Sequence, residues 1–171
     1  MKKFSLTLFM TLFALLASAS DIKVTQGKTS YLKSEGTMTV VFNWDNAKWD
    51  RGSSVKDEWA EQFESYKNEG EQFFIDGFNK SSKMVNLSTE NSTADYTMNV
   101  EFTNFDKFYS VMSLVPGHKH KVWANITVTD NKTGETVCKY KVTEFEGGRD
   151  FSLFDSYTEM MRDLGSKLAK K

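Results

Sequence analysis

The chain has two histidines, His118 and His120, which stand one residue apart in PGHKHKVW, residues 116–123. In an extended chain alternate side chains share one side, so the two imidazoles could bind one zinc ion. A closed zinc site needs two further ligands, and a catalytic site needs a third ligand and a water. No third ligand stands near the pair in sequence. A metal site at His118 and His120 therefore stays an alternative to the ordinary start of a strand.

The segment NWDNAKWD, residues 43–50, sets Asp45 and Asp50 beside Trp44 and Trp49. Paired carboxylates flanked by tryptophans could bind a sugar or act as acid and base in glycoside hydrolysis. The same residues also suit a turn before a helix, whose N-terminal dipole favours nearby acidic groups. We favour the turn, expect no catalytic residue in the chain, and rank a hydrolase last among its functions.

Two further features could carry chemistry, and both have simpler explanations. Cys138 is the only cysteine, which excludes an internal disulfide, and it shares the strand phase of Tyr140 and Val142. We expect it to be buried and structural. EGGRD, residues 146–150, sets two glycines before a helix, but it lacks the spacing of a phosphate-binding loop. We therefore predict that the protein is not an enzyme and has no cofactor.

The elements that must position these residues follow from the spacing of apolar side chains. Alternation of apolar and polar residues predicts strands with one buried face over 36–44, 95–105, 121–130 and 136–145, with a weaker strand at 84–87. Apolar residues at helical spacing predict amphipathic helices over 55–78, capped by Ser54, and over 153–168. The order predicts an α+β fold: a single mostly antiparallel or mixed sheet with two amphipathic helices packed on one face.

The connection between the strands 95–105 and 121–130 is long and apolar. It reads FDKFYSVMSLVPG over residues 105–117, although loops are normally polar. Such a segment either packs back on the sheet or forms an arm that presents an adhesive surface to a partner. Both alternatives stay open. The candidate partner-binding residues are Phe105, Phe108, Tyr109, Met112, Leu114 and Val115.

Residues 1–20 have the pattern of a secretory signal peptide: two lysines near the start, an apolar run, and the small residues Ala-Ser-Ala. The apolar run is shorter than the roughly 20 residues of a membrane span. We expect cleavage to leave residues 21–171 as a single α+β domain with no transmembrane segment. The leader looks bacterial, so we expect export to the periplasm or the extracellular space.

Composition limits the partners of the mature chain. The 22 basic and 23 acidic residues give a formal net charge of −1, so no overall field attracts nucleic acid. With 39% hydrophobic and 14% aromatic residues, the chain can bury a sizeable core without disulfides. A partner would therefore be recognised through a local surface.

Several segments carry a resemblance to a known group. They are GTMTVVFNWDNAKWD, SVMSLVPGHK, TVTDNKTGE and EFEGGRDF, and the chain resembles an uncharacterised group of small exported Bacteroidetes proteins. More coarsely, the ADY strand start, the VTDNKTG hairpin and the terminal helix are similar to the amino-terminal domain of TolB, an envelope protein. The resemblance implies an α+β envelope domain used for protein contacts, with no catalytic residues.

These observations favour a noncatalytic exported protein-interaction module of the cell envelope. The apolar segment 105–117 is its candidate contact surface and a protein of the envelope its expected partner. The alternative is a small-ligand or metal-binding protein, with the histidine pair as the metal site.

Overall fold

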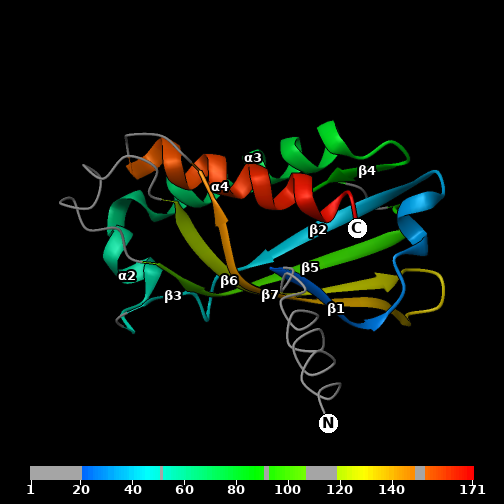
Figure 1. Cartoon of the computed structure of the whole chain (residues 1–171), viewed down its shortest axis with the longest axis horizontal. Helices are drawn as coiled ribbons and strands as arrows, with labels where there is room; N and C mark the ends of the chain where they lie inside the picture. The colour runs from blue at the N-terminus through cyan, green and yellow to red at the C-terminus, as the bar shows by residue number, and fades with distance from the viewer. Residues whose placement is uncertain (1–20, 51, 91–92, 107–118, 149–152) are drawn as a thin grey trace, which may run out of the picture.

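The computed structural model describes residues 21–50, 52–90, 93–106, 119–148 and 153–171. Within them the chain forms one sheet, two long helices and several short helical turns (Figure 1). The strands are β1 (Ile22–Gly27), β2 (Gly36–Asn43), β3 (Lys48–Trp49), β4 (Val85–Ser88), β5 (Tyr96–Phe105), β6 (His120–Asp130) and β7 (Thr136–Gly147). The helical elements are η1 (Ser30–Lys33), α2 (Val55–Trp59), η2 (Ala60–Gln62), α3 (Phe63–Ser81) and α4 (Leu153–Leu168).

The sheet has seven strands in the order β1-β7-β6-β5-β2-β4, and β3 pairs with β5 beyond the end of β2. The strands β5, β6 and β7 form an antiparallel meander, and β1 is antiparallel to β7. The strands β2, β3 and β4 join by parallel pairing. The protein is therefore an α+β fold with one mixed sheet, as predicted.

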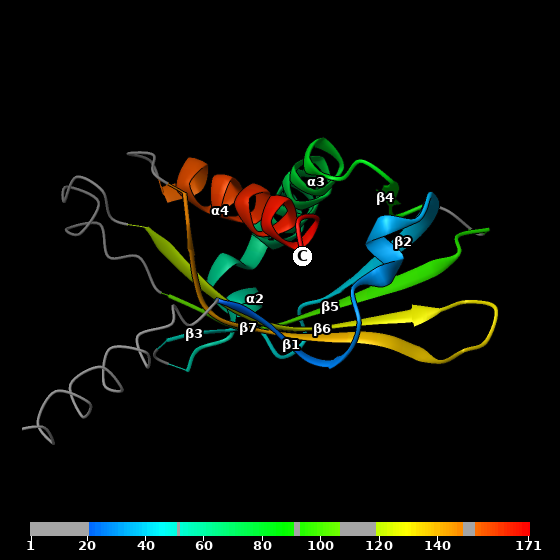
Figure 2. The same ribbon diagram turned by 45° about the vertical axis from the view of Figure 1, so that its right-hand side comes forward.

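The core lies between one face of the sheet and the long helices α3 and α4, which Figure 2 shows on the same side of the sheet. Alternating residues of β5, β6 and β7 face this layer, and Cys138, Tyr140 and Val142 are buried in it. The opposite face carries exposed polar residues, as on a sheet that contacts water on one side. The binary pattern of the strands thus determines which face the helices cover.

The two long helices approach each other closely at glycines. A Cβ atom at Gly77 of α3 would overlap the carbonyl oxygen of Arg162, and one at Gly165 of α4 would overlap that of Phe74. Small residues at both positions therefore allow the backbones of α3 and α4 to meet. This contact fixes the helical layer above the sheet.

The five strands that the sequence predicts and the terminal helix fall where it places them, within two residues at each end, whereas β1 and β3 are not predicted. Two expectations need correction. Residues 21–35, where the sequence predicts no element, contain β1, with Ile22 buried against β7. The helix predicted over 55–78 is interrupted after Trp59, where Ala60 has a φ of 44°. The interruption allows the Trp59 ring to contact Trp44, Trp49 and Tyr157.

Candidate protein-contact sites

Aromatic rings fill the end of the molecule where β5 and β6 leave the sheet. The Trp44 ring stacks on Phe105 with centroids 5.5 Å apart and planes inclined by 2°, and it lies 4.4 Å from the Phe102 ring. Trp59 joins the group through Trp44 and Tyr157. We call this group the aromatic end: Trp44, Trp49, Trp59, Phe63, Phe102, Phe105 and Tyr157. Such ring pairs stabilise a fold beyond the area they bury.

One acidic residue lies against this aromatic group. Trp44 Nε1 donates a hydrogen bond of 2.8 Å to Glu71 Oε1 on α3. Burial raises the pKa of the Glu71 carboxyl, and the hydrogen bond from Trp44 opposes that rise. The pair connects α3 to the loop after β2, so the indole nitrogen is satisfied within a largely apolar region.

The aromatic end holds both ends of the apolar connection in register. Phe105 pairs with Val122 across β5 and β6, and Asp106 N donates to Lys121 O at 3.0 Å. The next described residue is Lys119, so the connection begins and ends on one fixed hairpin base. The candidate residues Phe108, Tyr109, Met112, Leu114 and Val115 lie outside the described residues, and their role in binding stays a prediction.

Phe105, which the sequence offers as a candidate partner-binding residue, lies in the core. Its side chain is 2% exposed and belongs to the core, where it stacks on Trp44. The reason is its strand phase, which it shares with the buried Phe102 across the bulge between Phe102 and Asn104. In this chain Phe105 anchors the start of the connection, and its ring is not available to a partner.

His120 opens β6 opposite Gly147 and is 5% exposed on the core side of the sheet. It shares that face with Val122 and Ala124, as the strand phase predicts. His118 lies outside the described residues. Among the residues that the structure describes, no three His, Cys, Asp or Glu side chains are grouped to hold a metal ion.

The Trp and Asp residues of 43–50 separate into two environments. Trp44 is buried, whereas Asp45 and Asp50 are exposed. Asp45 N donates to Asn43 Oδ1 at 2.8 Å, and Asp50 N donates to Phe105 O at 2.9 Å. Residues 44–47 therefore form a turn, as favoured from the sequence, and Lys48 and Trp49 form the short strand β3, which pairs with β5.

Cys138 lies beneath two tyrosines at the other end of the sheet. The hydroxyl groups of Tyr31 and Tyr140 are 2.6 Å apart in a buried hydrogen bond, which joins η1 to β7. Burial raises the pKa of both hydroxyls and of the Cys138 thiol. A buried thiol with a raised pKa is a poor nucleophile, so the expected structural role of Cys138 fits its surroundings.

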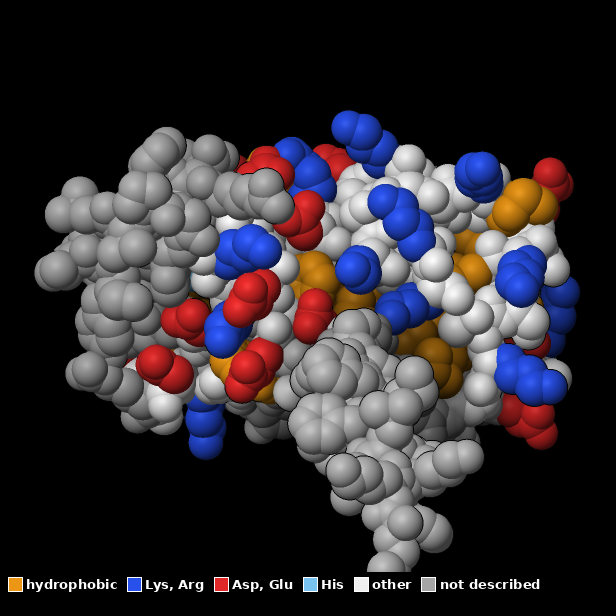
Figure 3. Space-filling model, in the orientation of Figure 1, with side chains coloured by type: hydrophobic (Ala, Val, Ile, Leu, Met, Phe, Trp, Pro, Cys, Tyr) orange, Lys and Arg blue, Asp and Glu red, His pale blue; other side chains and the backbone are white. Residues whose placement is uncertain are grey.

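A groove of about 700 Å³ opens between the end of β7 and the C-terminal half of α4. Its lining mixes acidic and basic side chains, and Figure 3 shows them intermingled on this side of the molecule. Glu144 lines it with a φ of 50°, at the bulge where β7 turns toward α4. The lining consists of Asp21, Lys119, Thr143, Glu144, Phe145, Glu146, Asp163, Ser166, Lys167 and Lys170.

A second, smaller groove of about 300 Å³ follows the outer side of β2. The strand β4 pairs only with residues 36–39 of β2, so the rest of β2 borders this groove. Val41, Phe42 and Phe63 supply apolar surface, and Val41 is 46% exposed. The groove is thus a gap in the sheet margin.

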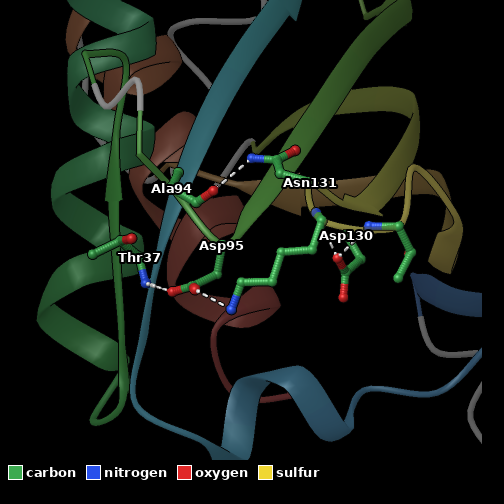
Figure 4. A network of polar contacts seen from close by, with 7 residues as sticks. Thr37, Ala94, Asp95, Asp130 and Asn131 are labelled. Carbon is green, nitrogen blue, oxygen red and sulfur yellow. Dashed lines mark hydrogen bonds and ion pairs between the residues drawn. The ribbon is translucent and has the colours of Figure 1, made fainter.

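The end opposite the aromatic group is held by polar contacts (Figure 4). Asp95 Oδ2 accepts from Thr37 N at 3.1 Å, and its Oδ1 lies 3.6 Å from Lys132 Nζ. Asn131 Nδ2 donates to Ala94 O at 2.8 Å. The hydrogen bond from Thr37 N, and after it the charge of Lys132, lower the pKa of Asp95. We call this the polar end: Thr37, Ala94, Asp95 and the β6–β7 turn at residues 130–135.

No helix of the described residues is both long and apolar enough to span a membrane.

The fold has a counterpart among solved structures. No protein-family model and no curated protein matches the sequence. The PelC dodecamer from Paraburkholderia phytofirmans matches with a TM-score of 0.50 and 11% identity, over 85% of this chain and 96% of that chain. Protein XCC0632 from Xanthomonas campestris, of the DUF330 family, matches with a TM-score of 0.41 and 9% identity, over 83% and 86%. The likeness to PelC is one of fold alone.

Proposed function

We propose that this protein is a noncatalytic, exported interaction module of the cell envelope, which binds a protein partner through the apolar segment 105–117, beyond its buried first residue Phe105. The hairpin base carries the proposal. Phe105 is stacked in the aromatic end, and Asp106 is hydrogen-bonded to Lys121, so both ends of the segment start from a rigid platform. A rigid base lowers the ordering cost of a binding loop.

Other features support the same role. The leader pattern of residues 1–20 favours export to the periplasm or beyond. The segment contains Phe108, Met112 and Leu114, side chains typical of contact surfaces. The PelC protein that shares the fold is described as a dodecamer, so this architecture serves protein assembly in at least that case. The resemblance to exported Bacteroidetes proteins and to the TolB amino-terminal domain agrees with an envelope role.

Partner capture from an envelope extract tests the proposal. The mature chain is compared with Phe108→Asp/Leu114→Asp, which places two charges in the apolar segment. We expect the wild-type chain to retain one reproducible protein, identified by mass spectrometry, and the double variant to lose it because burying a carboxylate in an apolar contact is costly.

Met84→Asp provides the matched control, since Met84 is an apolar side chain, 37% exposed, between α3 and β4, where its carbonyl accepts from Gly36 N. Circular dichroism and thermal unfolding establish that every variant is folded. Equal capture by all three chains contradicts the proposal, as does the absence of any reproducible partner. Binding of the purified partner to the purified chain then establishes that the contact is direct.

A further inference from the structure

One margin of the sheet has a closed part and an open part. The strand β4 lies outside residues 36–39 of β2, and beyond it residues 40–43 of β2 pair on their outer side with no strand of the described residues. Unbonded N–H and C=O groups at a sheet edge are templates for another strand. The two parts of this margin therefore differ in their capacity to accept one.

Side chains at the end of α3 close the outer edge of β4. Asn79 Nδ2 donates to Leu87 O at 2.9 Å, and Asn79 Oδ1 accepts from Leu87 N at 2.8 Å. Ser82 Oγ accepts from Val85 N at 3.0 Å. One amide side chain thus makes both of the hydrogen bonds that a neighbouring strand would make at Leu87, so β4 does not offer this edge to a partner.

The backbone of β2 directs groups outward where β4 has ended. Gly36 N donates to Met84 O, on the side of β4, at 3.1 Å. Thr37 N donates to Asp95 Oδ2 at 3.1 Å on the opposite side (Figure 4). The pairing of β2 with β5 continues without a register shift to the end of β2, so this alternation holds along the strand. Phe42 therefore directs its N–H and C=O outward, as Gly36 does.

A groove of about 300 Å³ lies outside this open part and offers contacts to side chains. Phe42 and Phe63 line it on the core side of the sheet, and Val41 lines it on the open face. Val41 is 46% exposed, more than any other large apolar side chain of the described residues. A strand added at this edge would cover apolar surface on both faces of the sheet.

The charges of the lining indicate which side chains the groove accepts. Lys67 Nζ lies 3.2 Å from Glu64 Oε2, so these two charges compensate each other. Lys56 Nζ lies 5.9 Å from the centre of the Phe63 ring and has no ion pair among the described residues. Asp45, the other charged residue of the lining, lies in the turn after β2. The Phe63 end of the groove therefore suits an apolar side chain with a carboxylate two residues away in an extended chain.

We propose that residues 40–43 of β2 bind an extended peptide segment of a partner protein as an added strand. An apolar side chain of the peptide lies against Phe42 and Phe63, and an acidic side chain lies at Lys56. Backbone hydrogen bonds to Phe42 supply affinity, and the two side-chain contacts supply selectivity. The site uses no residue of the apolar segment 105–117, so it is a second contact surface that does not depend on the proposed function.

A synthetic peptide tests the proposal. The probe is acetyl-Ser-Thr-Glu-Thr-Leu-Thr-Glu-Thr-Ser-amide, whose leucine and glutamates share one face of an extended chain, so either strand direction presents a carboxylate to Lys56. We expect fluorescence anisotropy of the labelled probe to show saturable binding to the mature chain. Amide hydrogen exchange at Phe42 should slow when the probe is bound. A probe with lysine in place of both glutamates should bind more weakly.

Backbone methylation distinguishes strand addition from contacts of side chains alone. The N–H groups of successive residues in a strand point to opposite sides. Methylation of the leucine amide and of the next amide therefore removes a donor toward β2 in either strand direction. We expect the methylated probe not to bind, and equal binding of the two probes overturns the proposal.

Charge variants of the chain test the position of the peptide. Lys56→Glu reverses the charge beside Phe63, and Lys83→Glu, at an exposed lysine between α3 and β4, is the control. We expect Lys56→Glu to weaken binding about fivefold and Lys83→Glu to leave it unchanged. Equal binding by the two variants, preference for the lysine probe, or no saturable binding at millimolar concentration also overturns the proposal.

Light scattering without the probe distinguishes a partner peptide from a second copy of the chain. Self-association that the probe reverses would assign the open edge to a second copy and overturn the proposed occupant. The Phe108→Asp/Leu114→Asp chain should bind the probe like the wild type, so this inference and the proposed function fail independently.

Discussion

The two ends of the sheet are closed in different ways. At the polar end, on the right of Figure 1, Asp95, Asn131 and the residues around them are held by short hydrogen bonds, and β6 turns into β7 through residues 131–135. At the aromatic end, on the left, the rings of Trp44, Phe102 and Phe105 pack together, and residues 106–119 connect β5 to β6. The first arrangement closes the sheet with few residues.

This difference distinguishes the residues that are needed to join two strands from those that are free to serve another role. The polar end shows that a hairpin of this sheet needs only a short turn with an Asx contact, in which Asp130 Oδ1 accepts from Lys132 N at 2.8 Å. The longer apolar connection at the aromatic end is therefore not required by the fold. Loops that are longer than is needed to connect two strands often carry binding functions.

The largest expected effect comes from removing a ring at the aromatic end. Trp44→Ala removes the stacking with Phe105 and the hydrogen bond to Glu71 Oε1. We expect the free energy of unfolding to fall by about 3–5 kcal/mol, as for large aromatic truncations in cores. Denaturant unfolding measures it, with Met84→Ala as an exposed control. A loss below about 1 kcal/mol would mean that the ring cluster is not the anchor of this end.

A smaller effect is expected where α3 approaches Tyr157. A Cβ atom at Gly70 would overlap the Tyr157 hydroxyl, so Gly70→Ala forces a shift of that side chain. Overpacking costs about 1–3 kcal/mol, and the gain in helix propensity offsets about 1 kcal/mol of it. In a Tyr157→Phe background, which lacks the nearest atom, the cost should be lower. Additive effects in this double-mutant cycle would contradict the contact.

The Glu71 carboxyl makes the stability of the aromatic end depend on pH. Its raised pKa means that the folded chain holds a proton more tightly than the unfolded chain. Its contribution to stability is therefore complete below its ordinary pKa of 4.5 and decreases as pH rises through the raised value. Because solvent screens the half-buried carboxyl, we expect this decrease in the free energy of unfolding to be less than about 1 kcal/mol. Glu71→Gln keeps an acceptor for Trp44 and should abolish the decrease. Urea unfolding across this pH range measures the slope, and an unchanged slope counts against the assignment.

The smallest effect is expected at the polar end. Asp95→Asn keeps an oxygen for Thr37 N but loses the ion pair with Lys132. Because the pKa of Asp95 is lowered, its contribution is present above the ordinary value of 3.8 and disappears as pH falls through the lowered one. Thermal unfolding should show a small decrease at neutral pH that vanishes in acid. If Asp95→Asn lowers the stability more than Gly70→Ala does, the polar end contributes more to stability than the aromatic end, contrary to this account.

The sequence predicts the meander and the helices well because their apolar residues follow strict periods. Tyr140 and Val142 alternate with exposed lysines, and Leu164 and Leu168 repeat at helical spacing. The sequence does not predict β1, because Ile22 and Val24 are its only apolar residues and all of the strand after Ile22 is exposed. The parallel placement of β2 beside β5 depends on contacts between distant segments, which periodicity does not encode.

The candidate sites were predicted less completely than the fold. His120 has the strand phase of Val122 and lies with it on the buried face. Phe105 was assigned to the connection, although the bulge after Phe102 keeps it in the core. The open part of β2 had no sequence signal, because it arises from the four-residue length of β4. Which backbone groups lie at the edge of a sheet is decided by how the strands pair, which the sequence pattern of a single strand does not show.

Site-specific photo-crosslinking in the exporting cell compares the two ends most directly. A photoreactive residue replaces Met112 in the apolar connection or Thr133 in the exposed polar turn. The account predicts that the Met112 position yields a discrete cross-linked protein and that the Thr133 position yields none. Equal products from both positions, or a product from Thr133 alone, would contradict the claim that the aromatic end carries the contact.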